Sequence, residues 1–408
     1  MTRIPLPQII KSEWLETVIY YSFIFLFLTV SLIPFQILEI KIKNVPFQYI
    51  YIGGFAAVLA VLSFLRNPKL TVFDKWLIFL VIGFSLSLIT SVDCIYTIRV
   101  LIGFFLKGIF VAFISDRILK DRVKTTNVIL IVCASLIAFV GIVELFFGWH
   151  LYYKPGEMPP QIVTSTLGNP LSLAAYLLLF LPLSFLYIEN KKSFIKFLPF
   201  LFITATILLS FSRSGWIALF FIIVIYFLGK GSLKKKFKNW VHAVSLVFVI
   251  VLVFFLIPQL CRNQFKDKFN VKMFSSASFE HRLKSYITTK NILKDYPLFG
   301  VGLGNYPKVH EKYMVEGVHK DTPTPDNMYL RFLCDTGIIG AGTFFVFIIY
   351  WMYQLWKKRD NPIIWAVFCG LIGFLINQLT ADLFLWSATQ FAFWMLLGWG
   401  VGLTNEKI

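Results

Sequence analysis

The residues best suited to chemistry include an arginine in a short polar turn, Ser210-Phe211-Ser212-Arg213-Ser214-Gly215-Trp216. The segments on either side of this turn, 195–209 and 216–228, are almost wholly apolar. Each segment can cross a bilayer as a helix, so we expect the turn at a membrane face. A guanidinium stays charged and matches phosphate oxygens with paired N–H groups. We therefore expect Arg213, aided by the Ser210 and Ser212 hydroxyls, to bind a phosphate-bearing lipid head group. The alternative is a helix-end arginine that only reaches the interface.

Two further candidates lie in the long connection between the later apolar segments. Arg282 stands in a polar stretch, 279–293, that has a helical pattern and can equally be a solvated helix face. The segment Pro297–Tyr306 is rich in glycine but lacks the strand and the Lys-Ser/Thr of a nucleotide-binding loop. We therefore expect it to form a turn that brings backbone close to a helix or to a ligand.

Two candidate bases lie at the end of the same connection. The prolines at 323 and 325 stop any helix upstream, which predicts Asp326 at the N-cap of the next helix. An aspartate there either caps the helix, worth on the order of 1 kcal/mol, or accepts a proton. An ordinary carboxylate has a pKa far below 7, so a base needs burial or a nearby negative charge. His319 is the other candidate base, and its alternative is a plain loop residue.

Several ionisable residues lie within or beside apolar segments, namely Arg99, Lys107, Glu144, Arg331, Asp335 and Asp382. Charges at membrane depth are costly and usually face a cavity or a partner. Arg99 and Glu144 lie near the ends of consecutive spans and can pair with one another. Lys107 is nearer the middle of its span. We expect Lys107, together with Arg99 if that residue is not paired, to line a cavity for the lipid phosphate.

The composition excludes an ordinary soluble domain, because 58% of the 408 residues are hydrophobic and only 15% are charged. Soluble domains carry roughly a quarter charged residues. Apolar segments predict an all-α, polytopic membrane protein with about twelve spans. These spans are 17–37, 46–64, 76–90, 96–115, 127–147, 171–188, 195–209, 216–228, 241–260, 337–356, 362–380 and 384–403. The first span lacks a cleavage site after it, so we expect no cleavable signal peptide.

The positive charge predicts the orientation of the spans rather than nucleic-acid binding, although the net charge is +18. Lysines and arginines are concentrated in alternate connections such as 230–238 and 357–359, and the short connections on the other side carry only Lys41, Lys43, Lys154 and Arg213. Positively charged loops stay in the cytoplasm, so both termini are expected there, with the Arg213 turn facing outward. The chain then divides into spans one to nine (1–260), an extracytoplasmic loop (261–327) and spans ten to twelve (328–408).

Cysteine usage gives no sign of a metal or disulfide framework. The five cysteines are an odd number, and no Cys-x-x-Cys pair occurs among them. We therefore expect no metal site and no cofactor.

Four stretches resemble motifs of the O-antigen ligase/O-antigen polymerase superfamily (Wzy-like proteins) of bacterial polysaccharide assembly. The turn Ser210–Trp216 is similar to its Ser-x-Ser-Arg-x-Gly-Trp turn, and Thr166–Pro170, followed by Ala174 and Tyr176, is similar to its Gly-Asn-Pro segment. Arg282 and Pro297–Tyr306 resemble the arginine and the glycine-rich stretch of its large periplasmic loop. Asp326-Asn327, followed by nine residues and then Gly337-Ile338-Ile339-Gly340, resembles its His-Asn-x9-Gly-x-x-Gly signature.

The resemblance implies a GT-C-like membrane glycosyltransferase that inverts the sugar linkage without a metal. Its donor is an oligosaccharide on undecaprenyl pyrophosphate. By motif, Arg213 and Arg282 would bind the pyrophosphate, and Asp326 would act as the base, with Asn327 and Tyr329 beside the substrate. The implied location is the outer face of the bacterial cytoplasmic (inner) membrane. Expected partners are the bilayer, the lipid-linked glycan, a flippase and a chain-length regulator, and the expected oligomeric state is a monomer.

The chain departs from the family signature at Asp326, where the ligases have histidine. This difference favours a polymerase, which joins lipid-linked repeat units, over a ligase, which transfers the finished glycan to a lipid or cell-wall acceptor. A transporter of lipid-linked sugars is a further alternative. It is less favoured because transporters place charged residues at mid-depth in repeated halves, whereas most candidates here lie at the outer face.

Overall fold

The computed structural model describes residues 13–33, 41–42, 45–46, 49–147, 163–189, 194–229, 276–316 and 324–405. In these ranges the chain is almost entirely helical, which confirms the predicted all-α class. The exception is a short antiparallel pair in which β1 (Lys41–Ile42) contacts β2 (Val45–Pro46). The predicted span 241–260 and the candidate base His319 lie outside the described residues.

The first part of the chain forms a series of apolar helices. They are α1 (Glu13–Leu32), α3 (Gly54–Arg66), α4 (Val72–Ser85), α5 (Cys94–Phe104), α6 (Phe110–Ile118), α7 (Val123–Phe147), α8 (Pro170–Glu189), α9 (Leu198–Leu209) and α10 (Arg213–Leu228). Single π-helical stretches, Tyr49–Gly53 and Phe105–Ile109, precede α3 and join α5 to α6. Short 3-10 turns lie at Leu86–Leu88, Lys120–Arg122, Ser165–Leu167 and Phe194–Phe197.

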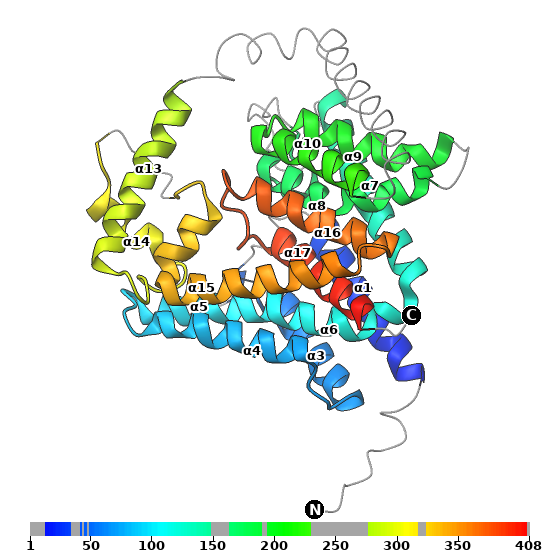
Figure 1. Ribbon diagram of the computed structural model, residues 1–408, viewed down its shortest axis with the longest axis horizontal. Helices are drawn as coiled ribbons and strands as arrows, with labels where there is room; N and C mark the ends of the chain where they lie inside the picture. Colours follow the sequence, from blue (N-terminus) through cyan, green and yellow to red (C-terminus); the bar gives the residue numbers. More distant parts are fainter. Residues whose placement is uncertain are drawn as a thin grey trace, which may run out of the picture.

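The second part contains two helices of the long connection and three more apolar helices. They are α13 (Ser276–Asp295), α14 (Tyr306–Tyr313), α15 (Met328–Lys357), α16 (Pro362–Asn377) and α17 (Ser387–Thr404). In Figure 1, α15 runs beside α4 and α5, whereas α13 lies across one end of these helices with α14 next to it. We call this the α13 end of the bundle.

Every predicted span within the described residues contains a helix, but not all of these helices are long enough to cross a bilayer alone. Five are, by length and hydropathy: Glu13–Leu32, Cys94–Ile118, Lys120–Phe147, Pro170–Tyr187 and Met328–Lys357. Four shorter apolar helices occur at Tyr51–Arg66, Ile195–Leu209, Arg213–Leu228 and Pro362–Asn377. The described residues therefore support a multi-pass membrane protein, while the count of twelve spans stays a prediction.

The centre of the bundle is formed by α8, α16 and α17, which pack closely through small residues. Almost every side chain of α17 is buried. A Cβ atom added at Gly370 of α16 would stand 2.2 Å from the backbone oxygen of Leu179 in α8. Small residues allow such approaches between membrane helices. This contact matters for function because α16 ends at Asn377, beside the candidate site described below.

We expect Gly370→Ala to lower the thermal unfolding midpoint, because its methyl group would push α16 away from the α8 backbone. Gly342→Ala is the matched control, since an added Cβ there has no neighbour within 4 Å and alanine favours helix. The midpoint of each detergent-purified variant can be followed by tryptophan fluorescence at one fixed heating rate. Equal midpoints for the two variants would show that this approach does not limit packing.

Candidate active site

The predicted phosphate-binding turn is a tight connection between α9 and α10. The Ser212 side chain caps α10 by accepting from the Gly215 backbone N–H at 3.1 Å. The Ser210 hydroxyl donates to the Ile207 carbonyl at 2.7 Å. Both serines are buried, and these hydrogen bonds hold the turn. Their contact with a substrate stays a prediction. Arg213 follows as the first residue of α10 and is half-buried.

The backbone of this turn is strained at the residue before the cap. Phe211 has φ +52°, a left-handed conformation that bulky residues rarely adopt. Trp216 supports the turn by donating its indole N–H to the Leu208 carbonyl at 3.2 Å. Such strained conformations persist only where several surrounding contacts hold the backbone in place, and they are frequent at functional sites.

The structure brings two predicted site residues together although 44 positions separate them in the sequence. Arg282 on α13 places its Nε atom 3.9 Å from the Asp326 Oδ2 atom. Their side chains are 28% and 37% exposed, so the pair is accessible from outside the bundle. The Arg282 Nε atom itself is buried and has no hydrogen-bond partner among the described residues. Arg282 thus lies near the carboxylate without a hydrogen bond from Nε to it.

The prediction that Asp326 caps the next helix is wrong. The N-cap of α15 is Asn327, whose side-chain oxygen accepts from the backbone N–H groups of Tyr329 and Leu330 at 2.9 and 3.1 Å. Asp326 precedes the cap with φ +49°, which aspartate tolerates better than most residues. Its side chain is therefore not used in capping, so the capping explanation of this residue no longer applies.

The glycine-rich segment performs the backbone role expected of it, against a break in α15. Gly337 has φ +64° and ψ −173°, which interrupts the helix. The break leaves backbone groups of α15 without helical partners, and the segment 297–302 forms hydrogen bonds with them. Before the break, the Cys334 and Asp335 carbonyls accept from the Val301 and Gly302 N–H groups, each at 2.9 Å. After it, the Ile338 N–H donates to the Pro297 carbonyl, also at 2.9 Å. An added Cβ at Gly337 would lie 2.2 Å from the Leu298 carbonyl oxygen, so only glycine fits.

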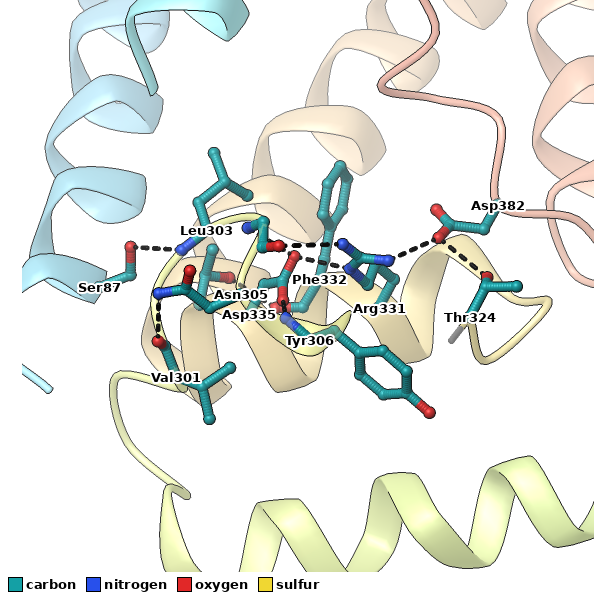
Figure 2. A network of polar contacts seen from close by, with 12 residues as sticks. Ser87, Val301, Leu303, Asn305, Tyr306, Thr324, Arg331, Phe332, Asp335 and Asp382 are labelled. Atoms are coloured by element: carbon teal, nitrogen blue, oxygen red, sulfur yellow. Dashed lines mark hydrogen bonds and ion pairs between the residues drawn. The ribbon is translucent and has the colours of Figure 1, made fainter. Parts of the chain in front are cut away.

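A buried ionic network lies beside this break (Figure 2). Arg331 on α15 donates through Nε to Asp335 Oδ2 at 2.8 Å and through Nη1 to Asp382 Oδ2 at 3.1 Å. Asp335 also accepts from the backbone N–H groups of Gly304 and Tyr306 at 2.8 and 2.9 Å. The sequence marked these three charged residues as unusual but did not assign them to the site. The Arg331–Asp382 contact depends on tertiary structure, whereas the i, i+4 spacing of Arg331 and Asp335 could have signalled their pairing on a helix.

Asp382 lies in the connection between α16 and α17 and is linked to Asp326. The Thr324 hydroxyl donates to Asp382 Oδ2 at 3.2 Å and accepts from the Asp326 backbone N–H at 3.2 Å. Burial raises the pKa of the Asp382 carboxyl, and the Arg331 guanidinium opposes this shift by favouring the ionised form. Asp382 and Asp326 are close enough for their negative charges to interact.

The end of α16 connects the Arg213 turn to the Asp326 region. Asn377 donates its side-chain amide to Ser214 of α10 at 3.1 Å. The next residues bind the start of α15: Met328 N–H donates to the Gln378 and Ala381 carbonyls at 3.1 and 3.0 Å, and the Asn327 amide donates to the Leu379 carbonyl at 2.8 Å. The Tyr329 hydroxyl also bonds the α16 backbone, at the Leu375 carbonyl. The Arg213 turn and the Asp326 region are therefore both fixed to the same end of one helix.

The two predicted lipid-phosphate residues on the long helix α5–α6 have different surroundings. Lys107 is buried in the π-helical stretch and donates to the Ser387 hydroxyl at 3.0 Å, at the first residue of α17. Arg99 is exposed on α5. Its expected partner Glu144 is buried on α7 and accepts from the backbone N–H groups of Thr164 and Ser165 at 3.2 and 2.6 Å. The roles of Lys107 and Arg99 remain predictions.

Within the part of the chain that the structure describes, no three His, Cys, Asp or Glu side chains are grouped as metal ligands. The four cysteines described there are free thiols. The groups brought together at the α13 end are instead arginines, carboxylates, hydroxyls and an amide. Such groups can bind a phosphate and move a proton.

We expect Asn327→Ala to lower the thermal unfolding midpoint, because loss of a helix cap costs about 1 kcal/mol. Asp326→Asn is the control for loss of charge and should leave the midpoint unchanged, since asparagine tolerates positive φ. Differential scanning calorimetry of both purified variants against the unchanged protein tests this. An unchanged midpoint in Asn327→Ala would contradict the capping role of Asn327.

Comparison with known proteins agrees with this arrangement. Residues 198–345 match a family model described as O-Antigen ligase. The match includes the Arg213 turn, Arg282 and the Asp326–Gly337 region, and it leaves Lys107 and Asp382 outside. A search for similar curated proteins found no match. The family match confirms the resemblance drawn from the motifs over this part of the chain, and the apolar helices support a multi-pass membrane protein.

Proposed function

We propose that the protein is a glycosyltransferase that polymerises the repeat units of a surface polysaccharide. Its donor is an oligosaccharide on undecaprenyl pyrophosphate, and its acceptor is another lipid-linked unit. The observation that carries this proposal is the meeting of Arg282 with Asp326 at the α13 end, where α16 also fixes the Arg213 turn. A phosphate-binding cation and a carboxylate base are the two groups that such a transfer needs.

In the proposed reaction, an acceptor hydroxyl oxygen attacks the anomeric carbon of the donor sugar. The bond from that carbon to the pyrophosphate oxygen breaks, and undecaprenyl pyrophosphate leaves with the electron pair. The hydroxyl proton passes to the Asp326 carboxylate. Attack opposite the leaving group inverts the anomeric configuration. The diphosphate is already a good leaving group, so the reaction proceeds without a metal.

Arg213 and Arg282 are the proposed ligands of the pyrophosphate. Guanidinium groups bind phosphate oxygens in pairs and stabilise the negative charge that develops as the leaving group departs. The Nε atom of Arg282 supports this role, because it has no hydrogen-bond partner among the described residues and Asp326 approaches it only to 3.9 Å, so a pyrophosphate oxygen can bind there. Asn327 and Tyr329, at the start of α15, are the further residues that we propose to contact the substrate.

Asp326 is the proposed base. Its position supports this role, because its side chain does not cap α15 and lies 3.9 Å from Arg282, a proposed pyrophosphate ligand.

The proposed location is a bacterial cytoplasmic membrane, with both termini in the cytoplasm and the α13 end facing outward. This orientation follows from the distribution of lysines and arginines in the connections. A flippase would supply the lipid-linked unit, and a chain-length regulator would limit the product. The family description keeps a ligase as the second candidate, in which the acceptor is a lipid or cell-wall glycan.

Reconstitution in liposomes with undecaprenyl-pyrophosphate-linked repeat units alone should give a ladder of lengthened chains on a gel. Arg282→Gln should lower kcat/KM for the donor by about 10²-fold, as removal of one transition-state donor typically does. Lys284→Ala on the same helix is the control, because Lys284 pairs only with Glu280 among the described residues. No ladder, but transfer after addition of a second lipid or wall acceptor, would establish the ligase instead.

Asp326→Asn should lower kcat by about 10²-fold or more, because the amide keeps the shape of the side chain but cannot accept the proton. Donor binding, measured by KM, should change little or improve, since Arg282 loses a competing charge. Full activity in this variant would remove Asp326 from the mechanism, and His319 would then be the base to test.

A further inference from the structure

Thr324 lies between two groups that the mechanism treats separately. On one side is the Asp326 base, and on the other is the buried pair of Arg331 and Asp382. The Thr324 hydroxyl contacts both, accepting from the Asp326 backbone N–H and donating to Asp382 Oδ2, each at 3.2 Å. One oxygen therefore connects the backbone of Asp326 to a charge pair in the bundle, and Figure 2 shows the part of this connection that joins Thr324, Asp382 and Arg331.

The Asp382 side of this connection has a fixed position. The Arg331 side chain is 10% exposed and the Asp382 side chain is 12% exposed. Arg331 is held in turn by Asp335 and by the Gly304 carbonyl. Separating a buried charge from its partner is strongly unfavourable, so this pair does not rearrange readily. Thr324 is thus bonded to one of the least movable points at the α13 end.

On the Asp326 side, the side chain lies 3.9 Å from Arg282 and the backbone N–H donates to Thr324. Asp326 adopts φ +49°, which a short polar residue can leave at modest cost. It is not held by capping, because Asn327 performs that role. Pro325 restricts the backbone between Thr324 and Asp326, so a bond from the Asp326 N–H to the Thr324 hydroxyl closes a small, stiff turn. This turn fixes where the Asp326 carboxylate stands.

We propose that Thr324 is a positioning residue for the transfer, whose hydroxyl transmits the fixed position of the Arg331–Asp382 pair to the Asp326 base. This inference rests on the proposed function of Asp326. Thr324 does not touch the substrate in this role. It acts through the backbone of Asp326 and leaves donor binding to Arg213 and Arg282.

The test compares Thr324→Val, which keeps the shape but removes both bonds, with Thr324→Ser, which keeps the hydroxyl. Thr324→Val should lower kcat roughly tenfold, as loss of one or two hydrogen bonds allows, with the donor KM unchanged. Thr324→Ser should retain activity. Thr404→Val is the control, because it removes a hydroxyl that only bonds the Val401 carbonyl at the other end of α17.

A second measurement tests the turn without any turnover. Amide hydrogen exchange at 326–330 should be faster in Thr324→Val, and should be unchanged in Thr324→Ser and Thr404→Val. Unchanged exchange in Thr324→Val would overturn the proposed positioning even if no polymerase activity is found. An unchanged kcat in Thr324→Val would also overturn it. So would a rise in the donor KM as large as the fall in kcat, together with a lower thermal unfolding midpoint, because that pattern indicates a general structural loss. Absence of a ladder from the unchanged protein would instead refute the proposed function.

Discussion

The buried Arg331 guanidinium is the interaction on which the candidate site depends. It binds carboxylates from two different segments, Asp335 within α15 and Asp382 between α16 and α17. Charges of this kind are tolerated away from water only when they are paired and hydrogen-bonded. The pairing therefore fixes the α16–α17 connection against α15. Asp335 extends this constraint to the glycine-rich segment through the Gly304 and Tyr306 amides.

The break in α15 shows how a local irregularity is used to join segments. A helix interrupted at Gly337 leaves amides and carbonyls that must find partners, since unpaired buried backbone groups are costly. The segment 297–302 supplies them by running against the break. The same segment follows α13 directly, so α13 and its Arg282 are held at a defined place relative to the start of α15. The meeting of Arg282 and Asp326 is a consequence of this backbone pairing.

Two strained residues, Phe211 and Asp326, mark the two halves of the site. Each lies just before a capped helix start, with Ser212 capping α10 and Asn327 capping α15. The caps and the contacts with the end of α16 hold these conformations in place. Strain that is held by surrounding contacts keeps side chains such as Arg213 and Asp326 in defined directions before any substrate arrives.

The sequence by itself determined the helical class, the positions of most apolar helices, the helical stretch of Arg282 and the turns that carry Arg213 and Asp326. These features depend on composition, periodicity and local turn residues, which act over a few positions. The sequence misplaced the cap of α15, because aspartate and asparagine are equally good caps and adjacent residues compete for one position. Only the tertiary structure decided that Asn327 caps the helix, that Arg282 meets Asp326, and that Arg331 joins Asp335 to Asp382. The Arg282–Asp326 and Arg331–Asp382 contacts link residues tens of positions apart, and these partners are selected by the packing of α13, α15 and α16 rather than by any local preference of the chain.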